Sequence, residues 1–188
     1  MAAGFSSRMN TDKLMLDFQG KPMLERVIQA AVKSKIDDIV LVYRDHNVKA
    51  LAENYNISLV YNDEAHIGQS SSMKVGIKKS NSETDAFIFL VGDQPFLTSV
   101  IIDNLIHTYD IEGSRIIVPK YNGKNGNPVI FPISYVEKLL SINGDSGGRK
   151  IIREENENVT FVHIDNPVLG VDMDTLEEYK KWNSKTII

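Results

Sequence analysis

The chain has 188 residues, of which 42% are hydrophobic and 24% are charged, and its formal net charge at pH 7 is -4. This length and composition are typical of a globular protein with one domain, and the acidic balance argues against DNA or RNA as a partner. The sequence has no cysteine and no apolar run near the roughly 18 residues of a membrane span, which excludes disulfides and thiolate chemistry and favours a cytoplasmic protein without a membrane partner.

The hydrophobic pattern alternates between the helical and the extended period along the whole chain. Pro22 suits a first helical turn and begins a helical pattern. The apolar face of this helix consists of Met23, Leu24, Val27, Ile28 and Ala31. The further elements expected in chain order are a strand at 39–43, a helix at 46–55, a strand at 58–61, a helix at 71–79, a strand at 86–91, a helix at 99–109, strands at 115–118 and 128–131, helices at 133–140 and 148–155, a strand at 159–164 and a helix at 175–182. The run at 86–91 is continuously apolar, so we expect both faces of that strand to be covered.

Strands that alternate with helices indicate βαβ units and a mostly parallel sheet, so the expected fold class is α/β. Ligands of such sheets bind beyond the carboxyl ends of the strands. The candidate loops are therefore 2–13, 62–72 and 92–98. The first of these loops has no strand before it in the sequence, so we expect a sheet whose first strand is missing or truncated. We expect the gap to expose apolar surface and unpaired backbone groups unless another segment covers it.

The loop at 2–13 combines a small-residue turn, hydroxyl groups and positive charge. Small residues at Ala2, Ala3 and Gly4 let the backbone turn sharply and approach a ligand closely. Successive backbone N–H groups in such a loop form a concavity that binds anions. Arg8 can bind phosphate oxygens in a bidentate manner, and Lys13 adds a mobile positive charge. These groups predict a nucleoside triphosphate site.

The second loop is polar and leads into the helix at 71–79. Its amide and hydroxyl groups can contact a base, or a phosphate at the helix N-terminus. A helix cap within a solvated loop is the alternative, but the run of polar residues exceeds what a cap needs. The expected nucleotide-binding residues of both loops are Ala2, Ala3, Gly4, Ser6, Arg8, Lys13, Asn62, Gly68, Ser71 and Ser72.

Asp93 follows Gly92 directly after the most hydrophobic strand, where a carboxylate is well placed to hold a magnesium ion that bridges to phosphates. The alternative is that Asp93 caps the next helix, but Thr98 or Ser99 is better placed for that role. We therefore assign Asp93 to metal binding.

Asp172 and Asp174 offer two more carboxylates, which share one face if their segment is extended. We favour Asp172 as the second metal ligand. Asp174 or Thr175 is then the cap of the last helix, since Thr175 and Glu178 have the spacing of a capping box.

Several segments resemble those of the MobA-like nucleotidyltransferases, and most closely those of the molybdenum cofactor cytidylyltransferases. They follow the family's order over nearly the whole chain and are A-A-G-F-S-S-R-M-N-T-D-K, G-K-P-M-L, G-Q-S-S-S-M, G-D-Q-P-F-L-T, G-N-P-V-I-F and D-M-D-T-L-E-E. The resemblance implies one Rossmann-like nucleotidyltransferase domain over residues 1–188, built as a three-layer sandwich. Asn10 departs from the family's usual glycine, and Asn127 departs from the histidine of many relatives, which leaves the acceptor open.

The resemblance also implies a reaction in which the terminal phosphate of molybdopterin attacks the α-phosphate of CTP and pyrophosphate leaves. Catalytic roles would fall to Arg8 at the β- and γ-phosphates, Lys13 at the α-phosphate and Asp93 at Mg2+ or Mn2+, while Ala3 and Gly4 would line the base and ribose. Such a transfer depends on positioning and charge stabilisation, so it needs no nucleophilic side chain.

The nucleotide and the class of activity have alternatives. Guanine-specific relatives tend to carry a second glycine within the turn at residues 2–4, so the sequence here favours CTP over GTP. A guanylyltransferase, or an NTP transferase with another phosphorylated acceptor, remains the nearest alternative. A non-catalytic carrier, which hands molybdenum cofactor to a molybdenum hydroxylase apoenzyme, is the alternative outside the enzymes.

Overall fold

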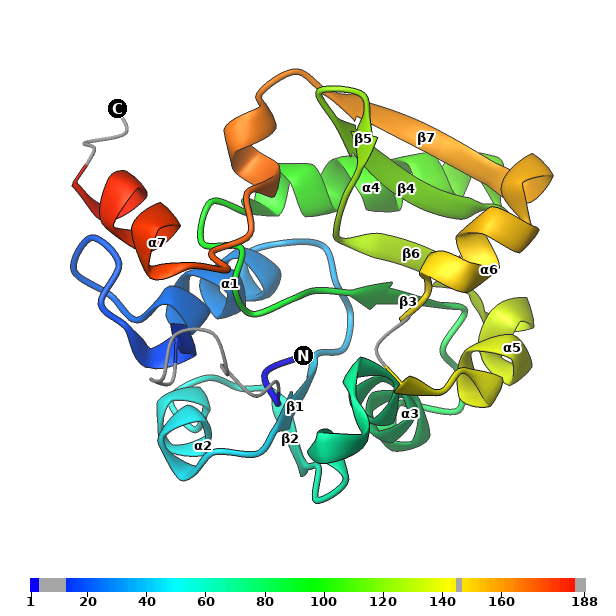
Figure 1. Ribbon diagram of the computed structural model, residues 1–188. Coiled ribbons are helices and arrows are strands. Elements are labelled where there is room, and N and C mark those ends of the chain that lie inside the picture. The colour runs from blue at the N-terminus through cyan, green and yellow to red at the C-terminus, as the bar shows by residue number, and fades with distance from the viewer. Residues whose placement is uncertain (4–12, 145–146, 185–188) are drawn as a thin grey trace.

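The computed structural model describes residues 1–3, 13–144 and 147–184. Its strands are twisted, and helices cover them on both faces (Figure 1). The strands are β1 (Val40–Tyr43), β2 (Ser58–Tyr61), β3 (Ala86–Phe89), β4 (Ile116–Tyr121), β5 (Lys124–Asn125), β6 (Val129–Pro132) and β7 (Val159–Ile164). The helices are α1 (Met23–Val32), α2 (His46–Ala52), α3 (Gln69–Lys79), α4 (Ser99–Glu112), α5 (Val136–Ser141), α6 (Arg149–Glu154) and α7 (Leu176–Asn183). Each element expected from the hydrophobic pattern is found, with shifts at its ends. Among the described residues, no helix has the length and apolar character required to cross a membrane.

Most strands run in the same direction. β1 pairs with β2 in parallel, β4 pairs with β7 in parallel, and β6 lies antiparallel between β3 and β4. Ala2 forms a parallel bridge with Tyr43 at the end of β1, while Met1 exchanges backbone hydrogen bonds with Leu90 and Gly92 beyond β3. β1, β2, β3, β4 and β7 therefore run one way, and β5 and β6 run against them. The predicted α/β fold with a mostly parallel sheet is confirmed.

The helices form one layer on each side of the strands. α1, α2 and α4 pack on one side, where α1 buries the predicted apolar face of its sequence. α3, α5 and α6 pack on the other side, against β3, β4, β6 and β7. α7 packs beside α1 through an aromatic cluster that contains Phe18, Phe96 and Trp182. The result is the expected three-layer sandwich.

β3 has the covering that its apolar sequence predicts. Phe87 and Phe89 pack against the cluster that contains α3, α5 and α6, and Ala86 and Ile88 pack against the cluster that contains α1 and α4. Its residues are nevertheless only half-buried, since among the described strands β3 pairs only with β6 and β1 pairs only with β2. Met1 and Ala2 lie between β3 and β1 only at their carboxyl ends, and no other described residue pairs with the edges that these two strands turn toward each other.

Candidate functional site

Lys13, Asp93, Asp172 and Asp174 come together from distant parts of the chain, beyond the carboxyl end of β3. Lys13 begins the short 3-10 helix Lys13–Met15. Its Nζ donates to Oδ2 of Asp93 at 2.7 Å and to Oδ1 of Asp174 at 3.2 Å. One ammonium group therefore bonds to two carboxylates that lie far apart in the sequence.

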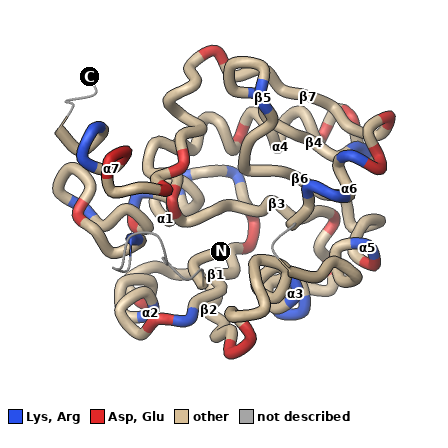
Figure 2. The backbone as a smooth tube through the Cα atoms, in the orientation of Figure 1, with Lys and Arg blue, Asp and Glu red and all other residues tan. Residues whose placement is uncertain are grey.

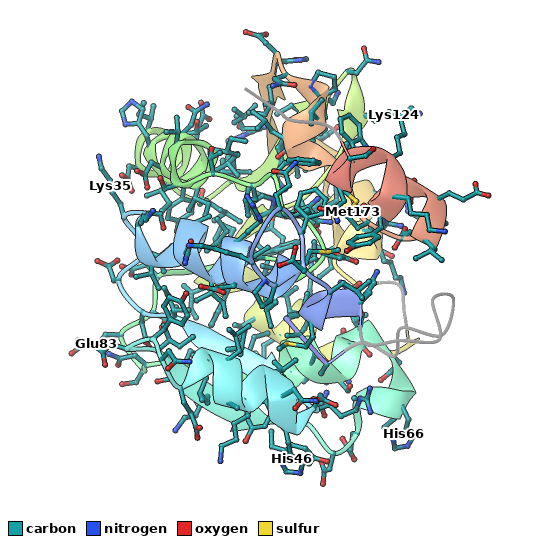
Figure 3. The ribbon with its side chains drawn as sticks, turned by 90° about the vertical axis from the view of Figure 1, so that its left-hand side faces the viewer. Lys35, His46, His66, Glu83, Lys124 and Met173 are labelled. Carbon is teal, nitrogen blue, oxygen red and sulfur yellow. The ribbon has the colours of Figure 1, made fainter. Side chains whose placement is uncertain are left out.

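Met173 explains how the two later carboxylates reach the site. Its backbone N–H donates to the carbonyl oxygen of Asp93 at 2.9 Å, and its side chain is fully buried. Figure 3 shows Met173 between α1 and α7, where it packs with Phe18 and Met23. The charges of Asp93, Asp174 and Lys13 all act on the carboxyl group of Asp172. Asp172 and Asp174 are therefore both brought close to Lys13 and Asp93.

The predicted helix caps are also found, and Asp93 is not one of them. Oγ1 of Thr98 accepts a hydrogen bond from the backbone N–H of Ile101 at 3.4 Å and caps α4. Thr175 and Glu178 form the expected capping box at the start of α7. Asp174 is thus not a cap, and its carboxylate contacts Lys13 instead.

Lys13 is held in its charged form. Burial alone disfavours the ammonium, but the charge and hydrogen bond of Asp93, together with those of Asp174, raise the pKa of Lys13 above its ordinary value. The side chain is only 17% exposed, so water screens these interactions weakly. A fixed positive charge of this kind suits a site where negative charge develops on a phosphate.

The environment of Asp172, in contrast, disfavours the charged form of its side chain. Burial, and then the negative charges of Asp93 and Asp174, raise the pKa of its carboxyl group from 3.8 to about 6, although Gln94 and Lys13 oppose the shift. Its Oδ1 is buried without a hydrogen-bond partner among the described residues. A bound cation would supply the missing partner, so Asp172 and Asp93 fit a divalent ion as a pair of oxygen ligands.

The carboxylates do not form a complete metal cage. Among the described residues, no group of three or more histidine, cysteine, aspartate or glutamate side chains is arranged to hold a metal ion. Magnesium needs no such cage, because it keeps several waters and binds through one or two carboxylates plus substrate phosphates. The donor set therefore fits an ion shared with a phosphorylated substrate.

Replacing Asp172 by asparagine is expected to stabilise the metal-free protein above pH 6. The folded state binds the proton of Asp172 more tightly than the unfolded chain, so its contribution to the free energy of unfolding falls as pH rises from about 4 to about 6. Above that range the loss is on the order of 2 kcal/mol. Thermal melts in EDTA at pH 4 to 8 should show Asp172→Asn several degrees above the parent at pH 7.5 and level with it at pH 4. A constant difference across this range would contradict the raised pKa.

The second predicted loop forms a closed hydrogen-bond network. Asn62 is fully buried, and its Nδ2 donates to Oγ of Ser71 at 2.9 Å and of Ser72 at 3.0 Å. Its Oδ1 accepts from the backbone N–H of Glu64 at 3.0 Å. Gly68 precedes α3 with a φ of 117°, a conformation that glycine adopts without strain. The predicted residues of this loop are thus brought together, with Asn62 fixing the backbone that leads into α3.

The first predicted loop is only partly described. Gly4, Ser6 and Arg8 lie outside the described residues. Ala2 and Ala3 are buried, and the backbone N–H of Ala2 donates to the carbonyl oxygen of Val42 at 2.8 Å. The small side chains therefore lie close to the backbone of β1.

Sequence reasoning missed two polar groups beside Asp172. Gln94 is 1% exposed, and its Oε1 has no hydrogen-bond partner among the described residues. Burial, followed by the charge of Asp172, raises the pKa of Tyr121 to about 12, so this phenol stays neutral and donates to the carbonyl oxygen of Asn127 at 2.9 Å. The G-D-Q-P segment could have indicated Gln94, but no sequence pattern connects Tyr121 with Asp172.

Comparisons with known proteins identify the family of the chain and solved structures with a similar fold. A sequence model described as the MobA-like NTP transferase domain matches residues 1–159. The chain is 26% identical over 191 residues to the purine catabolism protein PucB of Bacillus subtilis (strain 168), covering 95% of this chain and 91% of that protein. It is 32% identical over 125 residues to a probable molybdenum cofactor guanylyltransferase of Natranaerobius thermophilus, covering 65% and 59%. The solved structure of Rv0371c from Mycobacterium tuberculosis H37Rv in complex with manganese has a TM-score of 0.81 at 19% identity and covers 98% of this chain and 95% of that chain.

Proposed function

The chain belongs to the MobA-like NTP transferase family, and we propose that its reaction is the transfer of CMP from CTP to the terminal phosphate of molybdopterin. The observation that carries this proposal is the ammonium of Lys13 between Asp93 and Asp174, beside the buried Asp172 whose Oδ1 has no hydrogen-bond partner among the described residues. Fixed positive charge next to cation-binding oxygens is what a triphosphate needs. We propose that residues 1–188 act as one domain in the cytoplasm.

In the proposed reaction, an oxygen of the acceptor phosphate forms a bond to the α-phosphorus of CTP. The bond from that phosphorus to the α,β-bridging oxygen breaks, and pyrophosphate leaves with the electron pair. Asp93 and Asp172 would hold Mg2+ or Mn2+, which would neutralise negative charge on the phosphate oxygens. Lys13 would neutralise charge at the α-phosphate, and Arg8 would bind the β- and γ-phosphates.

The remaining predicted residues are assigned to the nucleoside. Ala2, Ala3, Gly4 and Ser6 would line the base and ribose through their backbone and small side chains. Gly68, Ser71 and Ser72 would form the facing loop. Asn62 would act as a positioning residue for that loop, because its own amide is occupied by the two serines and by the N–H of Glu64.

GTP is the competing nucleotide, and the similarity to a probable molybdenum cofactor guanylyltransferase is a specific reason to test it. The purified protein would be incubated with Mg2+, molybdopterin and each ribonucleoside triphosphate separately, and pyrophosphate release would be measured. Release with CTP alone is the expected result. Release with GTP alone would replace the proposed nucleotide, and binding of molybdopterin without any release would favour the carrier that serves a molybdenum hydroxylase apoenzyme.

A further inference from the structure

Gln94 is a buried polar side chain to which the proposed reaction assigns no role. It follows Asp93 in the loop after β3 and is 1% exposed. Glutamine is mostly exposed in proteins, because a buried amide loses its hydrogen bonds to water unless the protein replaces them. The described residues replace only some of these bonds. Nε2 donates to the carbonyl oxygen of Gly170 at 3.4 Å, whereas Oε1 accepts no hydrogen bond from them.

The carbonyl group of Gly170 fixes which end of this amide lacks a partner. If the amide were turned over, its Oε1 would face the carbonyl oxygen of Gly170, and neither atom can donate a hydrogen bond. Oδ1 of Asp172 is a second buried acceptor without a partner in the described part of the chain. Burial raises the pKa of that carboxyl group, and a hydrogen bond from the Gln94 amide acts against the rise, so the two side chains are in contact. Two neighbouring acceptors therefore lack a donor or a cation.

Two adjacent residues of the loop after β3 hold the segment that carries Asp172. The backbone carbonyl oxygen of Asp93 accepts from the N–H of Met173 at 2.9 Å, and the side chain of Gln94 bonds to Gly170. Asp172 lies between these two attachment points in the sequence. Figure 2 shows acidic positions on this segment, where it leads into α7. The placement of the Asp172 carboxylate relative to Asp93 therefore depends on both attachments.

Tyr121 packs against the same segment. A Cβ atom on Gly170 or on Gly126 would clash with the Tyr121 ring, so the ring lies directly on the backbone of both glycines. The Tyr121 hydroxyl donates to the carbonyl oxygen of Asn127 at 2.9 Å, which holds the ring in this orientation. Gly170 is thus in contact with both the ring of Tyr121 and the amide of Gln94, and these contacts restrict the segment that leads to Asp172.

We propose, on the basis of the metal site in the proposed function, that Gln94 is a positioning residue for the divalent ion. Its Nε2 holds the segment of Asp172 against the loop after β3, and its Oε1 accepts a hydrogen bond from a water molecule on the ion. A hydrated ion supplies both missing partners, because the metal binds carboxylate oxygen and its waters donate hydrogen bonds. A purely structural role does not explain Gln94, since an apolar side chain of similar size would fill the space without an unsatisfied acceptor.

The test measures Mn2+ binding without nucleotide, from the loss of the electron paramagnetic resonance signal of the free ion. Gln94→Met keeps the length of the side chain and removes its amide. It is expected to raise the Kd for Mn2+ about 10-fold or more, while Tm in EDTA stays the same or rises. Gln29→Met is the matched control and should keep the parent's Kd. Gln29 is half-buried, and its Nε2 donates to Glu25 at 3.0 Å and to Tyr55 at 3.1 Å, outside the cluster around Lys13.

A double-mutant cycle tests whether Gln94 acts through Asp172. Asp172→Asn should also weaken Mn2+ binding, because it removes a ligand charge. If Gln94 positions Asp172, the variant with both substitutions should lose less affinity than the product of the two separate losses. A loss equal to that product would show that the two side chains act independently, which contradicts the proposed positioning.

Three further results would overturn the role of Gln94. Equal Mn2+ affinity of the parent and Gln94→Met would do so and leave the proposed reaction intact. A collapse of Tm in Gln94→Met would assign the side chain to the stability of the fold instead. Absence of Mn2+ binding by the parent would remove the metal site itself. Conversely, weaker Mn2+ binding by Gln94→Met, combined with no pyrophosphate release by the parent, would refute the proposed reaction and support the role of Gln94.

Discussion

Asp93→Asn is expected to abolish nucleotidyl transfer, with kcat lowered about 10³-fold or more. Asparagine has nearly the same shape, but it removes the negative charge that pairs with Lys13 at 2.7 Å and that would bind the divalent ion. The fold should persist, because the bond between Met173 and Asp93 uses the backbone carbonyl, which the substitution leaves in place. Pyrophosphate release at saturating CTP, together with a thermal melt, measures both effects.

Asp165→Asn is the matched control for this loss. Asp165 is also an aspartate and is exposed, but it lies at the end of β7, outside the cluster around Lys13. Its variant should retain the parent's rate. A parental rate for Asp93→Asn would refute the assignment of Asp93 to the metal, and a collapse of Tm would show that the side chain is needed for folding.

Lys13→Ala is expected to lower kcat about 10²-fold with a smaller change in KM, because the charge would act mainly on the transition state. The substitution also removes the positive charge that pairs with Asp93 and Asp174. Lys13 lowers the pKa of Asp172 in the parent, so the pKa of that carboxyl group should rise in the variant. The pH profile of the residual rate should then shift to higher pH.

Lys21→Ala is the control variant for Lys13→Ala, and it should retain the parent's kcat and KM. Lys21 is exposed and its Nζ donates to Gln29 at 3.0 Å, away from the carboxylates. Steady-state kinetics of both variants with CTP and Mg2+ would separate the two roles. If Lys13→Ala changes KM alone, Lys13 serves in ground-state binding and its proposed role at the α-phosphate is wrong.

The local elements were predictable because their signals lie within short windows. The apolar face of α1, the cap at Thr98 and the capping box of Thr175 and Glu178 each depend on residues within about three turns of a helix. The alternation of these helices with apolar strands was enough for the α/β class. The partial exposure of β3 was not predictable in this way, because an apolar run does not reveal whether a neighbouring strand is present.

The candidate site was likewise predictable only in part from the sequence. Asp93 and Lys13 could be proposed from small-residue loops and from the position of a carboxylate after a strand. The contact of Lys13 with Asp174 joins residues that are 161 positions apart, and the local sequence around the aspartate indicates a helix cap instead. Asn62, expected to contact a ligand, is instead fully buried and bonded to its own loop.

The sequence by itself determined the order of helices and strands, the helix caps and the kind of chemistry at the loops, since propensity, periodicity and charge act over neighbouring residues. Only the tertiary structure decided which carboxylates share the ammonium of Lys13, how strongly burial perturbs Asp172 and Tyr121, and where two strand edges stay open. These properties depend on desolvation and on distances between segments far apart in the chain, which arise when the strands and helices pack.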